Sequence, residues 1–243
     1  MLQHRRLTLA SFESLVRDVL PYVPGCSESL IETNLRSATI ELCEKSKAYT
    51  YDLDPITTVS GIYEYEFDQP TGTDVHQVLW ATYDGHDLDP ISPRSLELNY
   101  PDWRDRGGTP TVYLQKTPDT FWLVPVPNSN NQLLLNVALR PTRTTNSIDT
   151  NFSDTYRDAI VYGTIYRLLR IPAKQWTDPM AAADYFNLFQ EQVRLAELKG
   201  RGGDTGVKRT VKYKSAGLSP RKRYGRYGNC LLYTSDAADE LRS

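Results

Sequence analysis

Hydrophobic side chains recur every three or four residues near the start of the chain, which is the spacing of an α-helix. Phe12, Leu15 and Val19 follow this spacing and Pro21 ends it, so the pattern predicts a short first helix. A longer helix is expected after Ser27, because serine is a favourable N-cap. The apolar positions of that second helix are Ile31, Leu35, Ala38 and Leu42. The two helices are expected to pack as a hairpin.

Strict alternation of apolar and polar residues replaces this pattern in the middle of the chain and predicts strands. Tyr63, Tyr65 and Phe67 alternate with glutamates, as in a half-buried strand. Further strands are expected at residues 75–83, 111–116, 120–124 and 132–140. Turn-forming sequences rich in Asp, Asn, Gly and Pro separate them. The region is therefore predicted to form an antiparallel β barrel or sandwich.

Helical spacing returns in the last third of the chain. A helix over residues 156–171 would have apolar side chains around most of its circumference, which indicates a central, buried helix. Gly163 within it predicts that the backbone of a neighbouring element approaches closely. The next helix is expected to begin with Asp178 as N-cap and Pro179 at its first position, and to end at Gly200. Its apolar positions are Ala182, Phe186, Phe189, Val193 and Ala196.

The predicted fold class is α+β. Two N-terminal and two C-terminal helices form one helical bundle, because neither helical hairpin covers its apolar stripe alone, and the β domain is inserted between them. The corresponding segments are a first helical half (1–53), the β insertion (54–148), a second helical half (149–199), an extended basic tail (200–229) and a C-terminal end (230–243).

The charges are unevenly distributed, although the 243 residues together carry only −2. Residues 1–198 contain 17 Lys and Arg against 26 Asp and Glu, a net charge of −9. Residues 199–229 contain 10 Lys and Arg against one Asp, a net charge of +9. An acidic body therefore carries a basic tail, and such asymmetry indicates an interaction with a partner.

The basic tail is glycine-rich and is expected to be ordered only by binding. Its cations and interleaved tyrosines would suit phosphates and stacked bases of nucleic acid. Its alternating pattern from residue 207 to 214 would instead suit a strand added to a partner's sheet. A solvated tail without a partner is the third interpretation. The residues assigned to docking are Val207, Lys208, Arg209, Val211, Lys212, Tyr213, Lys214, Arg221, Lys222 and Arg223.

Residue usage excludes several protein classes. Cys26, Cys43 and Cys230 are too few for a disulfide scaffold and, like the three histidines, lack zinc-ligand spacing. No apolar run is long enough for a signal peptide or a membrane-spanning helix. We therefore expect no metal, no cofactor and no membrane partner, and a reducing cytoplasm.

Candidate catalytic groups are sparse. Residues 84–87 (Asp-Gly-His-Asp) place a histidine beside carboxylates, but Asp-Gly is a common hairpin turn and no nucleophile accompanies it. Residues 100–105 form a polar loop with an aromatic anchor. The glycines after residue 199 match neither a dinucleotide-binding fingerprint nor an ATP-binding loop. A carbohydrate-binding or hydrolytic β domain would draw on Trp80, Trp103 and Trp122. None of these groups makes a convincing catalytic site, so we expect no enzyme.

Several short segments occur in the order and spacing of one known family. They lie at residues 38–43 (ATIELC), 54–57 (DPIT), 108–110 (GTP), 123–127 (LVPVP), 137–142 (VALRPT), 162–169 (YGTIYRLL) and 176–179 (WTDP). Through them the chain resembles the head-to-tail adaptor (connector) proteins of short-tailed bacteriophages. The resemblance covers roughly residues 12–199.

This resemblance implies a structural role. Such adaptors form rings, usually of twelve copies, between the portal and the tail nozzle or fibres, and their C-terminal region docks on the portal. The protein would then lie at the head–tail interface of the virion, after assembly in the host cytoplasm. An acidic ring would let DNA pass in transient contact without binding it. The alternative is a nucleic-acid-binding protein that uses the basic tail.

The last residues differ from the tail in charge and composition. Residues 230–240 (CLLYTSDAADE) resemble the translation of a sequencing adapter. On this interpretation Cys230 is not a natural cysteine, and the natural C-terminus is missing from the sequence. We therefore assign no function to this segment.

Overall fold

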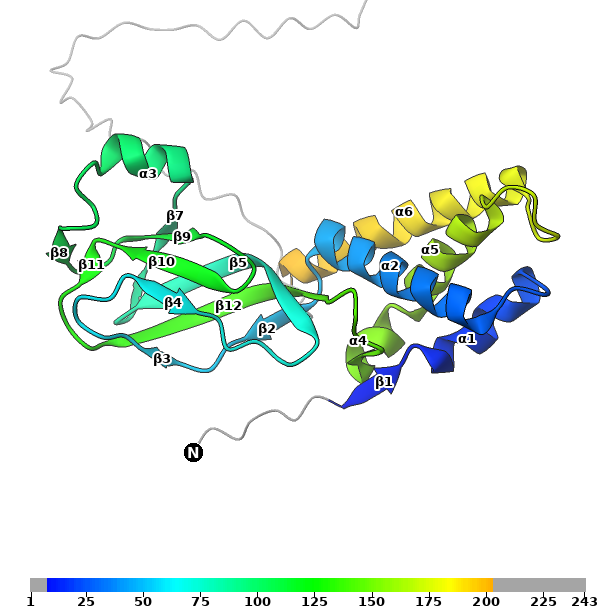
Figure 1. Cartoon of the computed structure of the whole chain (residues 1–243), viewed down its shortest axis with the longest axis horizontal. Coiled ribbons are helices and arrows are strands. Elements are labelled where there is room, and N and C mark those ends of the chain that lie inside the picture. The colour runs from blue at the N-terminus through cyan, green and yellow to red at the C-terminus, as the bar shows by residue number, and fades with distance from the viewer. Residues whose placement is uncertain (1–7, 203–243) are drawn as a thin grey trace, which may run out of the picture. The chain divides into compact units, whose positions relative to one another are not determined.

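The structure is a computed structural model that describes residues 8–202. After a first short strand, its elements follow one another as helices, then mostly strands, then helices again (Figure 1). The helices described are α1 (Glu13–Val19), η1 (Leu20–Tyr22, a 3-10 helix), α2 (Glu28–Ser46), α3 (Pro93–Asn99), α4 (Thr150–Thr155), α5 (Arg157–Leu169) and α6 (Pro179–Gly202). The mixed α+β class is confirmed, and the boundaries of the five predicted segments stay a prediction.

The strands form separate sheets. They are β1 (Leu9–Ser11), β2 (Thr50–Asp52), β3 (Ile56–Thr57), β4 (Glu64–Glu66), β5 (Thr73–Tyr83), β6 (His86–Asp87), β7 (Asp89–Pro90), β8 (Gly107–Gly108), β9 (Val112–Gln115), β10 (Thr120–Val124), β11 (Val126–Pro127), β12 (Gln132–Pro141) and β13 (Ser147–Asp149). A five-stranded sheet has the order β2-β12-β5-β6 with β3 also on β12, and a four-stranded sheet has the order β4-β10-β9-β7. Among residues 8–202 no sheet closes into a barrel, so the predicted barrel alternative is wrong.

Two strand pairings depart from the predicted antiparallel arrangement. β7 pairs with β9 in parallel, and so does β8 with β11. The connection from β7 to β9 contains the helix α3, which the alternating sequence pattern did not predict. Because this connection is long, β9 can run in the same direction as β7. The long pairing of β5 with β12 is antiparallel, as predicted.

One glutamine joins the two larger sheets. β12 pairs with one edge of β5, whereas β6 pairs with the other edge only at Thr82 and Tyr83, so backbone groups earlier in β5 have no ladder partner on that edge. Gln115 on β9 takes up two of them: its amide Nε2 donates to the Val75 carbonyl at 3.0 Å, and its Oε1 accepts from the Val78 amide at 3.2 Å. The hydroxyl of Tyr113, also on β9, donates to the Val78 carbonyl at 3.4 Å.

Four helices pack together beside the sheets. α2 and α5 lie side by side, and each also contacts α1 and α6 (Figure 1). The predicted inner face of α2 is confirmed, because Ile31, Leu35, Ala38 and Leu42 are fully buried. One buried apolar cluster runs from these helices into both larger sheets, so the inserted strands share their core with the helices.

The two glycines singled out in the sequence act differently from the prediction. A Cβ at Gly163 would lie 2.9 Å from the Phe189 ring and 3.0 Å from the Cβ of Ala38, so side chains rather than a backbone approach this glycine. The predicted stop at Gly200 is wrong, because α6 continues to Gly202. At Gly200 the backbone of Ala48 comes within 3.1 Å of the Cβ position, so this glycine permits a close crossing between α6 and the chain after α2.

Candidate interaction surfaces

The predicted docking residues, between 207 and 223, lie outside the part of the chain that the structure describes. Their role stays a prediction. The last described element, α6, leads along the chain toward them and ends at Gly202. The candidate surfaces within residues 8–202 are therefore found from exposed apolar side chains and from polar clusters on the helices.

The outer face of α6 carries an apolar stripe, called the outer stripe below. Its members and their exposed fractions are Met180 (83%), Leu188 (42%), Leu195 (47%) and Leu198 (57%). At about 100° per residue these four positions fall within about 80° of one another around the helix. Exposed apolar side chains that gather on one face mark a protein interaction site more often than scattered ones do.

The outer stripe faces water because the opposite, inner face of α6 packs against the core. Ala182, Phe189, Val193 and Ala196 are buried, as predicted, and they lie on the opposite side of the helix. The prediction for Phe186 is wrong, because 41% of its side chain is exposed. Phe186 lies at the border of the core, where its ring meets that of Tyr166 edge-on at 5.4 Å between centroids.

The sequence contained the signal for the outer stripe. Its residues recur at helical spacing between the positions of the inner set, so α6 also has apolar residues, interspersed with Asp184 and Glu191, on the face opposite its core. Helical spacing by itself does not distinguish the two sets, because it does not show which face of a helix is buried.

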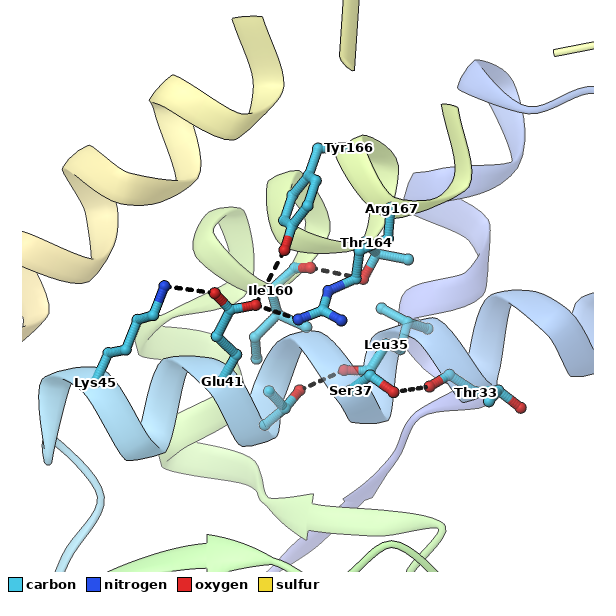
Figure 2. Close-up of polar contacts among 10 residues, drawn as sticks. Thr33, Leu35, Ser37, Glu41, Lys45, Ile160, Thr164, Tyr166 and Arg167 are labelled. Atoms are coloured by element: carbon cyan, nitrogen blue, oxygen red, sulfur yellow. Dashed lines mark hydrogen bonds and ion pairs between the residues drawn. The ribbon is translucent and has the colours of Figure 1, made fainter. Parts of the chain in front are cut away.

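A polar cluster ties α2 to α5 (Figure 2). Glu41 on α2 accepts hydrogen bonds from Lys45 Nζ at 2.6 Å and from the Tyr166 hydroxyl at 3.0 Å. Its second oxygen also pairs with Arg167 Nη2 on α5. Figure 2 shows the carboxylate of Glu41 between these three donors. The cluster fixes the rotation of α5 against α2, and through the ring of Tyr166 it also positions Phe186 and Phe189 of α6.

The neighbours of Glu41 lower the pKa of its carboxyl group. Partial burial by itself would raise the pKa of the Glu41 carboxyl. The hydrogen bonds from Lys45 and Tyr166, together with the charge of Arg167, outweigh burial, so the pKa lies below its ordinary value. Burial raises the pKa of the Tyr166 phenol, which therefore stays protonated and donates to Glu41. The ion pair is thus formed at neutral pH.

A pocket of about 470 Å³ lies where the ends of α2 and α6 meet the five-stranded sheet. Lys45, Trp80, Asn136 and Glu197 are among the residues that line it. Trp80 is 47% exposed, so it is a surface residue of β5 rather than part of the core.

The tryptophans do not form a shared binding platform. Trp103 is buried, and its ring packs against Trp122 at 5.2 Å and against Tyr63 at 5.1 Å. This cluster fills a small second core beneath α3 with Leu96 and other apolar residues. Trp80 belongs to a different sheet. The geometry therefore gives no support to a carbohydrate-binding face made of the three rings.

The Asp-Gly-His-Asp segment at residues 84–87 is a hairpin turn. Asp84 and Gly85 both have positive φ, at 51° and 77°, and Tyr83 pairs with His86 on either side of them. This is the two-residue hairpin that the sequence predicts. His86 and Asp87 are exposed, and the Nδ1 atom of His86 is hydrogen-bonded to the Asp84 carbonyl at 3.0 Å.

The loop at residues 100–105 is organised by the buried Trp103. The indole of Trp103 donates to Glu97 at 3.3 Å, and Arg104 lies over the same ring at 4.3 Å and donates to Glu97 at 3.1 Å. These contacts anchor the loop on α3.

The described residues fit neither the role of metal ligands nor that of membrane-spanning helices. Across the described residues, no three His, Cys, Asp or Glu side chains gather as metal ligands would. No helix in residues 8–202 has the length and apolarity needed to cross a bilayer.

Comparison with known proteins gives one family. The family model described as SU10 adaptor protein matches residues 8–211, which takes in every described residue and the first positions of the predicted docking segment. No curated protein gives a significant match to the chain.

Proposed function

The chain belongs to the SU10 adaptor family, whose members are phage head-to-tail adaptor proteins, and from this we propose that it forms a ring between the portal and the tail. The family is structural rather than enzymatic, and its members are virion components. The single observation that carries the proposal is the family match over residues 8–211. The outer stripe of α6 supports it, because subunits that associate side by side need exposed apolar faces.

The charge distribution suggests different roles for the acidic body and the basic tail in such a ring. The acidic body, −9 over residues 1–198, would repel DNA phosphates and so give a channel through which DNA slides. The basic tail, +9 over residues 199–229, would dock on acidic surfaces of the portal. In this proposal twelve copies surround the channel, and the tail nozzle or fibres bind the ring on the side away from the portal.

The test is electron microscopy of the full chain mixed with its cognate portal. We expect a ring of copies on one face of the portal. A variant that lacks residues 207–229 should lose portal binding and keep its melting temperature. The deletion begins at 207 because α6 extends to Gly202 and Gly200 packs against Ala48.

A variant that lacks only residues 230–243 is the matched control and should bind the portal as the full chain does. Unchanged portal binding without residues 207–229 would refute docking through the tail. Absence of any ring on the portal with the full chain would refute the adaptor ring itself.

Nucleic-acid binding by the same tail is the second candidate, favoured by its net charge of +9. A protein that neutralises Z phosphates loses affinity with a log–log salt slope of about −0.9Z. We expect the full chain to bind duplex DNA only weakly at physiological salt. Tight binding with a steep salt slope that disappears without residues 207–229 would favour the nucleic-acid function instead.

A further inference from the structure

We propose that the outer stripe of α6 packs against the α1 side of a second copy of this chain, so that each subunit uses two different faces. The inference rests on the proposed ring and names the surfaces that would form it. A ring built head to tail needs two unlike, complementary faces on each subunit, whereas a twofold dimer uses one face twice.

The two faces lie on opposite edges of the helical part of the molecule. α2 and α5 are central, and each contacts both α1 and α6 (Figure 1). The outer stripe faces away from this pair on one edge, while α1 forms the other edge. Copies joined through these edges would therefore associate head to tail and would not form a closed twofold dimer.

The α1 edge carries a groove, whereas the outer stripe consists of exposed side chains. A groove of about 430 Å³ lies along α1, and the apolar Val16 and Leu20 line it together with the polar and charged residues Ser11, Glu13, Ser14, Arg17 and Glu28. Ser14 and Arg17 are exposed to solvent. Leucine side chains of a neighbouring helix would enter such a groove beside the half-buried Leu20, and their own apolar surface would be removed from water.

Two oppositely charged residues on each edge can be matched in one orientation. α1 exposes Glu13 and Arg17 one turn apart, and α6 exposes Glu191 and Arg194 three residues apart. These separations are about 6 Å and about 4.5 Å along the helix axes. If the helices run antiparallel, Arg17 lies beside Glu191 while Glu13 lies beside Arg194. Within residues 8–202 no ion pair occupies Arg17, Glu191 or Arg194.

The decisive experiment is charge reversal with rescue. Arg17→Glu and Glu191→Arg each place like charges at the contact, and the combined variant restores an opposite pair in reversed order. Subunit association on the cognate portal is measured by mass photometry of full-length chains. We expect each single reversal to weaken association at least about ten-fold, because close charge pairs across an interface are coupled by more than about 1.4 kcal/mol. The combined variant should recover most of that loss.

Two further variants test the apolar contact. Leu195→Glu should abolish association, whereas Leu98→Glu, at a leucine on α3 that is 71% exposed, should leave it unchanged. In a Cys230→Ser background, Ser14→Cys combined with Leu195→Cys should form disulfide-linked ladders of several copies, which neither single cysteine gives. Cys26 and Cys43 are buried in the folded chain.

The outcomes separate this inference from the proposed function. Rings that form on the portal despite both single reversals and Leu195→Glu would overturn the α6–α1 contact and leave the adaptor function standing. Single reversals that weaken association without rescue by the combined variant would also overturn it. If the wild-type chain forms no ring on its portal, the proposed function fails first. Unchanged melting temperatures show that each variant is folded.

Discussion

The ring of Phe189 on α6 occupies the space that Gly163 on α5 leaves free. A Cβ at residue 163 would lie 2.9 Å from Cε2 of that ring. On the other side, the Cβ of Ala38 on α2 is 3.0 Å from the same point, so three helices converge on this glycine. The position of α6, and with it the direction of the outer stripe, depends on this close packing.

Gly163→Ala should therefore destabilise the protein although alanine favours helix formation. The helix gains about 1 kcal/mol in propensity, but overpacking a fully buried site costs about 1–3 kcal/mol. Urea unfolding would measure the net loss. Combining Gly163→Ala with Phe189→Leu should cost less than the sum of the two single changes, because the smaller side chain makes room. Simple additivity of the two changes would contradict this account.

Glu41→Gln should lower the free energy of unfolding by about 1–3 kcal/mol at neutral pH, because it removes the charge that pairs with Arg167 and weakens the bond from Tyr166. The pKa of Glu41 in the folded chain lies below its ordinary value of 4.5. Its stabilising effect is therefore complete above that value and is lost as the pH falls through the folded pKa.

Urea unfolding of wild type and Glu41→Gln at a series of pH values would test this. The difference between the two proteins should be constant above about pH 5 and shrink on acidification. Glu66→Gln, at an exposed position on β4, is the matched control and should change stability by less than about 0.5 kcal/mol at any of these pH values. A difference for Glu41→Gln that persists unchanged into acid would be incompatible with a lowered pKa.

Two predicted N-caps should respond differently to alanine. Asp178 accepts hydrogen bonds from the amides of Met180 and Ala181, both at 3.0 Å, so Asp178→Ala should cost about 1 kcal/mol. Ser27 occupies the cap position of α2 with extended backbone but makes no side-chain cap bond, so Ser27→Ala should cost much less. Thermal unfolding of both variants decides the matter, and equal losses would show that the side chain of Ser27 caps α2 after all.

Gly85→Ala should destabilise the β5–β6 hairpin by about 1–2 kcal/mol. Gly85 has a φ of 77°, where an L side chain is strained. Gly107→Ala is the control, since this glycine has no positive φ and nothing lies within 4 Å of its Cβ position. Chemical denaturation should separate the two variants. Similar stabilities would mean that the turn relaxes to accept alanine.

The local pattern of the sequence was enough to find most helices and the longer strands. The inner face of α2, the start of α6 at Pro179, the strands around β5 and β12, and the turn at Asp84 depend on spacing, capping and turn residues, which act over a few positions. The short helix α3 was missed because it spans only seven residues and has one buried apolar side chain.

Contacts between residues that are distant in the sequence determined the features that local patterns did not predict. The cluster of Glu41 with Tyr166 and Arg167 joins residues about 125 positions apart, and no local pattern indicates such a pair. The same holds for the approach of Phe189 to Gly163 and for the separate sheets in place of a barrel. The sequence shows apolar residues on two faces of α6. Only packing against α2 and α5 determines which of these residues are buried and which remain for a partner, because burial depends on the neighbours that the fold supplies.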